Sequence, residues 1–204
     1  MAAPLSRDVV VATARAQLER DDAGPLSLRA VARELGVTAP ALYLYVRDKQ
    51  DLLEGVAEDH FAMLVERFEA VTATDPLQRI RGLCHAYVDH ARSSPALFSL
   101  LFRYPPTQVP EADAFPPATL AFALAAEATQ AAIDAGLLAV QDATDASTVM
   151  WCAIHGVAEV VLMGFTADEG AVAALVDRVV DTVLAGQAAP PAPDPTAARA
   201  PARR

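Results

Sequence analysis

The chain has 204 residues, of which 53% are hydrophobic and 21% are charged, and this composition excludes a chain that is disordered throughout. The formal net charge of −10 argues against a protein whose whole surface binds nucleic acid, because phosphate binding needs clustered Lys and Arg. Only nine glycines occur and strand-like alternation is rare, so we expect an all-α fold of one or two small domains.

The acidic charge lies in one part of the chain. Residues 1–53 hold seven basic and seven acidic residues and are neutral overall, so residues 54–204 carry the entire net charge of −10. An acidic body repels DNA, and only the neutral N-terminal part is therefore expected to approach a duplex.

Membrane and export signals are expected to be absent. No apolar run of the length of a membrane span is free of charges or helix breakers, and no basic flank followed by an apolar core opens the chain. Cys84 and Cys152 need no disulfide in so large a core and fit a reducing compartment. We therefore expect a cytoplasmic protein without a membrane partner.

Apolar periodicity predicts about nine helices. In chain order they cover residues 6–22, 28–35, 39–46, 49–72, 76–92, 95–103, 116–136, 142–164 and 168–185. Asp75-Pro76 and Ser94-Pro95 each place a capping side chain before a proline that suits the first helical turn. Prolines gather within residues 104–117, which we expect to form a loop, and in the C-terminal tail, which we expect to be disordered.

The most informative stretch runs from Ser27 to Leu53. Its first apolar residues follow the i, i+3, i+4, i+7 spacing of a short amphipathic helix that ends at Gly36. These residues are Leu28, Val31, Ala32 and Leu35. Thr38 can cap a second short helix, and Asp48 can cap the long helix that follows. Two short helices joined by a glycine turn form a helix-turn-helix, whose second helix is shaped to enter the major groove of DNA.

The same stretch carries a more specific pattern. Its elements are Gly36-Val37-Thr38, Tyr43, Tyr45-Val46 and Lys49, followed by Leu52-Leu53. Together they resemble the signature of TetR-family bacterial transcriptional regulators, and the string LGVTAPALYLYV is especially close to the tetracycline repressor branch. The resemblance implies a homodimer that binds a double-stranded DNA operator, with a small ligand in the C-terminal domain that changes the affinity for DNA.

The resemblance also implies which residues contact DNA. Contacts to phosphates are implied for Thr38, Tyr43, Tyr45 and Lys49. Contacts to base edges are implied for Arg29, Ala39, Pro40, Ala41 and Leu44.

The residue types agree with these roles in part. Tyrosine and threonine hydroxyls and a lysine at a helix N-terminus are competent phosphate partners. The second helix has no long polar side chain, so it can touch thymine methyl groups but cannot form bidentate hydrogen bonds with bases. Arg29 is then the expected direct reader of a base, with guanine as its natural target. Ala30 stands where the family often has an acid that closes a capping box, so the helix start there is expected to be softer.

A second resemblance lies near the C-terminus. Trp151, His155 and Gly156 match the Trp-x-x-x-His-Gly motif of one TetR subgroup, and Trp151 and His155 are four residues apart on one helix face. They are expected to line a cavity for a small apolar or aromatic effector. The other residues predicted to line it are Phe98, Leu101 and Phe102. The alternative is that Trp151 and His155 are core residues whose polar atoms are bonded internally.

The last two helices carry more apolar surface than one buried face requires. Such broad faces suit a four-helix bundle made by two chains related by a two-fold axis. The residues predicted at this dimer interface are Val157, Val161, Leu175, Val176, Val179 and Val183. Two copies of the helix-turn-helix would then meet a pseudo-palindromic operator.

These predictions divide the chain into a helix-turn-helix DNA-binding domain over residues 1–48, an effector-binding and dimerisation domain over residues 49–186, and a disordered Pro/Ala-rich tail over residues 187–204. The predicted function is a ligand-responsive transcriptional regulator, expected to be a repressor. The short side chains of the second helix keep one alternative open, a helical ligand-sensing or protein-interaction module without specific DNA binding.

We expect neither catalysis nor a metal or other cofactor. The serines lack the surroundings of a nucleophile elbow, and no glycine-rich phosphate loop occurs. His85 and Asp89 lie on one helix face at i, i+4 spacing, which a salt bridge or hydrogen bond explains better than a metal site does.

Overall fold

The computed structural model describes the backbone of residues 4–20, 26–103, 116–166 and 168–188, and the side chains of these residues except 100–103. Within these ranges the chain forms nine α-helices, which confirms the predicted all-α fold. They are α1 (Arg7–Arg20), α2 (Leu28–Glu34), α3 (Ala39–Leu42), α4 (Lys49–Glu69), α5 (Pro76–Ser93), α6 (Pro95–Arg103), α7 (Pro116–Asp134), α8 (Ala143–Leu162) and α9 (Glu169–Gln187). Residues 104–115 of the expected loop and the expected tail from residue 189 onward lie outside the described residues.

The helix ends follow local chemistry. Asp48 caps α4 as predicted, since its Oδ1 accepts a hydrogen bond from the backbone N–H of Asp51 at 2.9 Å. α3 ends at Leu42, earlier than the predicted end at residue 46. The N–H groups of Tyr43 and Tyr45 bond to carbonyls three residues back, so this last turn is tighter than an α-helix.

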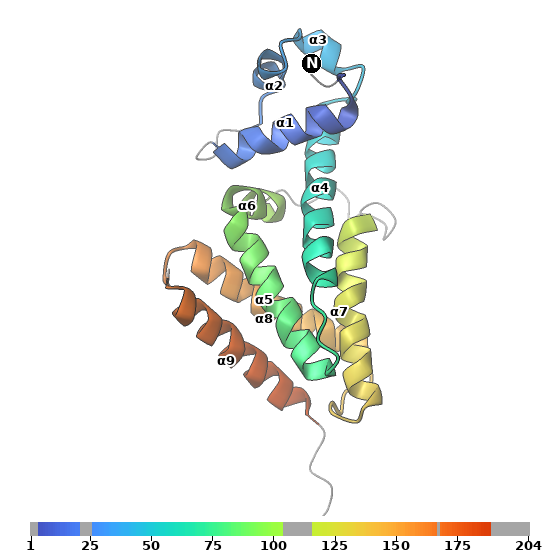
Figure 1. Cartoon of the computed structure of the whole chain (residues 1–204), viewed down its shortest axis with the longest axis vertical. Coiled ribbons are helices and arrows are strands. Elements are labelled where there is room, and N and C mark those ends of the chain that lie inside the picture. The colour runs from blue at the N-terminus through green and yellow to red at the C-terminus, as the bar shows by residue number, and fades with distance from the viewer. Residues whose placement is uncertain (1–3, 21–25, 104–115, 167, 189–204) are drawn as a thin grey trace, which may run out of the picture.

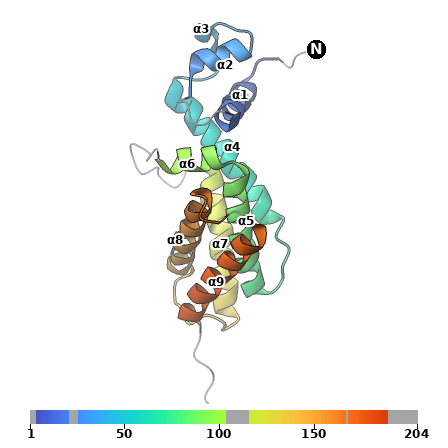
Figure 2. The same cartoon turned by 90° about the vertical axis from the view of Figure 1, so that its left-hand side faces the viewer.

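The helices form a head and a body that share one helix. In Figure 1, α1, α2 and α3 gather at one end of the molecule, and α4 runs from them alongside α5 and α7. The side view in Figure 2 shows α6 between the head and the rest of the body, beside α4. α8 packs against α5, α7 and α9.

Two hydrophobic cores underlie this division. α4 contributes Leu52 and Val56 to the core of the head, and Leu64 and Phe68 to the core of the body. Leu97 of α6 also belongs to the core of the head. Because α4 has side chains in both cores, a division of the chain after residue 48 remains a prediction.

One of the described helices, α8, is long and apolar enough to span a bilayer by length and composition alone. Its buried side chains pack in the core of the body, and they include Met150, Ile154 and Ala158. Apolar side chains of α8 therefore pack within the chain itself.

A buried carboxylate ties the head to the start of α4. Both carboxylate oxygens of Asp51 accept hydrogen bonds from the Arg7 guanidinium of α1, at 3.1 and 3.2 Å. The backbone N–H of Arg47 donates to Asp51 Oδ2 at 2.7 Å. Burial by itself raises the pKa of Asp51, but the hydrogen bonds from Arg47 and Arg7 outweigh burial and hold that pKa below its ordinary value.

A pair of buried histidines joins α4 to α5. The Nε2 atoms of His60 and His90 lie 2.9 Å apart, and both side chains are almost fully buried. Among the described residues neither Nδ1 atom has a hydrogen-bond partner. Burial lowers the pKa of His60 to about 4, aided by the charge of Arg15. Burial lowers the pKa of His90 to about 3, aided by His60 and Arg67.

We predict that Asp51→Ala destabilises the protein by about 2 kcal/mol, because it leaves donors of Arg7 and Arg47 without their buried acceptor. The matched control is Asp59→Ala, which removes the ion pair of Asp59 with Arg15 between the same two helices. That pair is more exposed, so its loss should cost less than about 1 kcal/mol. Chemical denaturation followed by circular dichroism at one protein concentration measures both. Equal losses would contradict the assigned role of Asp51.

The histidine pair predicts that stability falls as the pH drops below about 6.5. Both folded-state pKa values lie below the ordinary value of 6.5. At a pH between the folded-state pKa of a histidine and 6.5, that histidine therefore binds fewer protons in the folded state than in the unfolded state. Each histidine then contributes up to about 1.4 kcal/mol per pH unit. Thermal unfolding at about pH 7 and about pH 5 measures the change in stability with pH. The double variant His60→Leu/His90→Leu should have a shallower pH dependence; an unchanged slope contradicts the prediction.

Candidate functional site

The head contains the predicted helix-turn-helix. The Ser27 side chain accepts a long hydrogen bond of 3.4 Å from the N–H of Ala30, and α2 begins there. The chain turns at Gly36 with φ of +68°, a conformation that favours glycine. α3 then begins at Ala39, after Thr38. Thr38 is exposed and its side chain makes no capping bond, so its hydroxyl can face a ligand.

The residues around α3 form the outer surface of the head. Leu44 is 82% exposed and Tyr43 is 55% exposed, which is unusual for such large side chains. Thr38, Pro40, Lys49 and Arg29 are also exposed, and Ala39, Ala41 and Tyr45 are half-buried. Tyr45 and Ala39 also pack against the core of the head, so only part of each side chain is available for the predicted DNA contact.

The cations of the head fall into two groups. Four arginines pair with acids: Arg7 with Asp51, Arg15 with Asp59, Arg20 with Glu34, and Arg47 with Asp51 and Glu54. Within the part of the chain that the structure describes, no ion pair involves Arg29, Arg33 or Lys49, and all three are exposed. Arg33 is a candidate that the sequence reasoning missed, although its i, i+4 spacing from Arg29 places both on one face of α2.

A cavity of about 330 Å³ lies in the body among α4, α5, α7 and α8. The described residues that line it are Phe61, Leu64, Phe68, Ile80, Leu83, Cys84, Tyr87, Ala118, Ala121, Phe122, Ala125, Thr129, Ser147, Met150, Trp151 and Ile154. α7 contributes three alanines to this wall, and their short side chains leave the space that larger residues would fill. The sequence reasoning did not assign α7 to the site, because an alanine-rich helix has no chemical signature of its own.

Tyr87 is the centre of the polar contacts at one side of the cavity. The Trp151 Nε1–H donates to the Tyr87 hydroxyl at 3.2 Å, and that hydroxyl lies 2.9 Å from Nδ1 of His155. Phe98 packs edge-on against Tyr87, with ring centroids 5.8 Å apart. Burial raises the pKa of Tyr87 and lowers the pKa of His155, so both groups favour their neutral forms.

The structure separates the residues predicted to line the effector site. Trp151 lines the cavity. Phe98 and His155 contact Tyr87 from behind the cavity wall rather than lining the cavity, which corrects the prediction for these two. The side chains of Leu101 and Phe102 lie outside the described residues. The polar atoms of Trp151 and His155 are bonded to Tyr87, as the alternative expected. Neither is a core residue, because Trp151 is 40% exposed and His155 is half-buried.

The predicted dimer interface needs a correction as well. Val157, Val161 and Val176 are buried in the core of the single chain, and Leu175, Val179 and Val183 pack against that core half-buried. The correction concerns Val157, Val161 and Val176, because valine stripes that face the core and stripes that face a partner look alike in sequence. Leu175, Val179 and Val183 keep part of their surface exposed and stay predicted interface residues. The exposed stripe of α8 has i, i+3, i+4 spacing and consists of Val149, Cys152, Gly156, Val160 and Met163.

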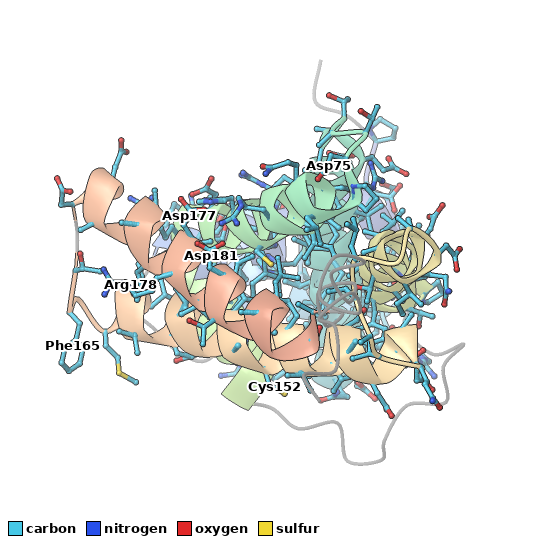
Figure 3. All side chains as sticks on the ribbon, turned by 90° about the horizontal axis from the view of Figure 1, so that it is seen from below. Asp75, Cys152, Phe165, Asp177, Arg178 and Asp181 are labelled. Atoms are coloured by element: carbon cyan, nitrogen blue, oxygen red, sulfur yellow. The ribbon has the colours of Figure 1, made fainter. Side chains whose placement is uncertain are left out.

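Figure 3 shows the two sides of α9. Asp177 and Asp181 turn toward α5, where both pair with Arg81, whereas Arg178, with Cys152 and Phe165 of the α8 region, lies away from it. His85 bonds to Asp177 at 2.9 Å rather than to Asp89, which corrects the proposed i, i+4 pair. Among the described residues, no group of three or more potential ligands could hold a metal ion.

Comparisons with known proteins agree with this architecture. Residues 10–56 match the family described as "Bacterial regulatory proteins, tetR family", and residues 80–183 match "Tetracyclin repressor-like, C-terminal domain". Neither description specifies the Trp-x-x-x-His-Gly subgroup, which stays a prediction.

Similar proteins cover nearly the whole chain. An uncharacterized HTH-type transcriptional regulator of Mycobacterium tuberculosis is 28% identical over 181 residues, which are 87% of this chain and 80% of that protein. The structure of a protein of unknown function from Rhodococcus sp. RHA1 has a TM-score of 0.77 and 28% identity, covering 91% of this chain and 97% of that one. The structure of RolR in complex with resorcinol has a TM-score of 0.67 and 16% identity, and the match covers 90% of this chain and 87% of that one. Because the C-terminal match alone spans half of the sequence, the chain belongs to the TetR family of bacterial regulatory proteins, and it is a DNA-binding transcriptional regulator.

Proposed function

We propose that the protein is a cytoplasmic repressor whose homodimer binds a pseudo-palindromic operator and releases it when a small apolar effector enters the body. The observation that carries the proposal is an apolar cavity whose wall includes α4, the helix that also belongs to the head. A ligand in that cavity touches the element that sets the position of the helix-turn-helix. It shifts DNA affinity to the extent that it binds one head position better than another.

The surface chemistry supports the DNA-binding role of the head. Exposed Thr38, Tyr43 and Lys49 offer two hydroxyls and an ammonium for phosphates, and Arg33 adds a second guanidinium beside Arg29. Leu44 extends from the tip of the head, where an apolar side chain can pack on a thymine methyl group. Arg29 is an exposed arginine of α2, the helix that packs against α3, and is proposed to contact guanine.

Two contacts could carry a ligand signal from the cavity to the head. Phe61, Leu64 and Phe68 of α4 line the cavity directly. The second contact runs through α6, where Leu97 is buried in the core of the head and its neighbour Phe98 packs on Tyr87 of the cavity wall.

The exposed apolar stripe of α8 supports dimerisation. Met163 is 67% exposed and Val160 is 38% exposed, and Phe165 just beyond the helix is 81% exposed. A monomer rarely exposes such residues in one continuous stripe, and the neighbouring outward face of α9 can complete a four-helix bundle with a second copy.

The decisive experiment is a gel-shift titration of the purified protein against the DNA upstream of its own gene. Saturable binding of a defined segment as a dimer supports the proposal. Binding that is equal for all DNA, or absent, would instead favour a ligand-sensing or protein-interaction module.

We predict that Arg29→Ala weakens binding by about 1–3 kcal/mol in each half-site of the operator and relaxes the base preference at one position there. The matched control is Arg33→Ala on the same face of α2. As a phosphate contact, Arg33 should affect all sequences equally, and its loss from both heads of the dimer should reduce the salt dependence by about two units of slope. Binding to a set of single-base operator variants at several salt concentrations measures both. A uniform loss for Arg29→Ala would make it a phosphate contact.

We predict that Val160→Glu yields monomers, because it places a charge in the apolar stripe of α8 without entering the core of the single chain. The control is Leu120→Glu on α7, since Leu120 is also exposed, at 46%, and lies outside the stripe. Sedimentation measures the mass of each variant. If Val160→Glu remains dimeric, the chains pair through another surface.

A further inference from the structure

The cavity wall contains very few polar atoms. Among the described lining residues, the side-chain oxygens belong to Tyr87, Thr129 and Ser147, and the side-chain nitrogen belongs to Trp151. None of these described lining residues is Asp, Glu, His, Lys or Arg. A ligand therefore meets almost only carbon, and the few polar groups decide which polar atoms of the ligand are tolerated.

Thr129 and Ser147 form a buried hydroxyl pair between α7 and α8. The Thr129 hydroxyl donates to the carbonyl of Ala125 at 3.0 Å, and the Ser147 hydroxyl donates to Thr129 Oγ1 at 2.9 Å. Both side chains are at least nine-tenths buried. Each hydroxyl proton is thus used within the protein, whereas both oxygens keep lone pairs that can accept a hydrogen bond.

The surroundings of the cavity disfavour a negative charge. Burial raises the pKa of the Cys84 thiol to about 12, and burial also raises the pKa of Tyr87, so neither lining group ionises at neutral pH. A carboxylate placed in the same space would be desolvated in the same way. Among the described lining residues it would find no cation, and the Thr129–Ser147 pair has no unused hydroxyl proton to compensate for the lost water.

We propose that the cavity binds an uncharged, mostly hydrophobic molecule with a hydroxyl or N–H group, whose hydrogen is accepted by the Ser147–Thr129 pair. The inference takes one point from the proposed function, namely that the effector binds in this cavity. It narrows the effector to neutral molecules with a hydrogen-bond donor, and it excludes carboxylates of the same hydrocarbon skeleton.

The test uses three probes with one hydrocarbon chain: decanol, decanoate and decyl methyl ether. The purified full-length protein is titrated with each at neutral pH, below the concentration at which the probe aggregates. Trp151 is the single tryptophan of the chain and lines the cavity, so its fluorescence reports binding directly. Decanol should bind at least about tenfold more tightly than decanoate, and roughly two- to tenfold more tightly than the ether, which has no donor.

The double variant Thr129→Val/Ser147→Ala tests the hydroxyl pair. It replaces both partners with apolar groups of similar shape, which is close to neutral for stability. Decanol should lose its advantage over the ether in this variant, while the affinity for the ether stays within about twofold. Decanoate binding as tightly as decanol, no binding of any probe, or a decanol advantage that survives in the double variant overturns the inference. If the variant fails to fold, the comparison of the three probes on the unmodified protein still decides.

A parallel measurement separates this inference from the proposed function. Operator binding is followed by gel shift in the presence of saturating decanol. If decanol binds with the expected selectivity but leaves DNA binding unchanged, the repressor mechanism fails and the ligand class stands. If a carboxylate binds more tightly and releases the operator, the ligand class fails and the repressor mechanism stands.

Discussion

The structure depends on one continuous helix that is packed into two cores. The first turns of α4 are fixed to the head by Leu52, Val56 and the buried carboxylate of Asp51, and its later turns are fixed in the body by Leu64 and Phe68. A hydrogen-bonded helix transmits a tilt along its length without bending unless a break interrupts its ladder, and α4 has no proline. A shift of the cavity end of α4 is therefore expected to become a displacement of the head.

α6 supplies a second contact between the same two parts. Leu97 and Phe98 are adjacent in sequence, yet Leu97 packs in the core of the head and Phe98 packs on Tyr87 at the cavity. The histidine pair meanwhile fixes α4 to α5 by a hydrogen bond whose acceptor must be a neutral ring. The head is thus held from two directions, and a ligand that repositions Tyr87 acts on α6 as well as on α4. In the proposed mechanism these two contacts define the states between which the effector selects.

Sequence patterns predicted most helices well because several helix ends have a local cause, although α3 ends earlier than predicted. Asp48, Asp75 and Gly36 act through capping bonds or a backbone angle that a few neighbouring residues determine. The cavity could be predicted only in part. Trp151 was predicted because it matches a family motif together with His155. The alanines of α7 matter through the space they leave, which depends on four helices meeting.

The residues of the dimer interface could be predicted only in part for a related reason. Val157 and Val176 are as apolar as Val160, and only the packing of α8 and α9 on α5 and α7 decides which of them faces outward. Periodicity identifies an apolar stripe on a helix, but it cannot assign that stripe to the chain's own core or to a partner when a helix carries both. Buried fractions from the folded chain resolve this ambiguity.

The small number of unpaired cations makes pairing of the chains a physical requirement of the proposed function. In each head, ion pairs engage four arginines, while Arg29, Arg33 and Lys49 have none within the described residues. With Arg29 assigned to a base, Arg33 and Lys49 leave about two phosphates per head for counterion release, which gives weak binding at cellular salt. A dimer doubles that number and makes the second contact intramolecular. Such a gain survives only while the spacing of the two heads matches the operator. A modest rotation of α4 in the proposed dimer can therefore remove most of the affinity without changing any residue that touches DNA.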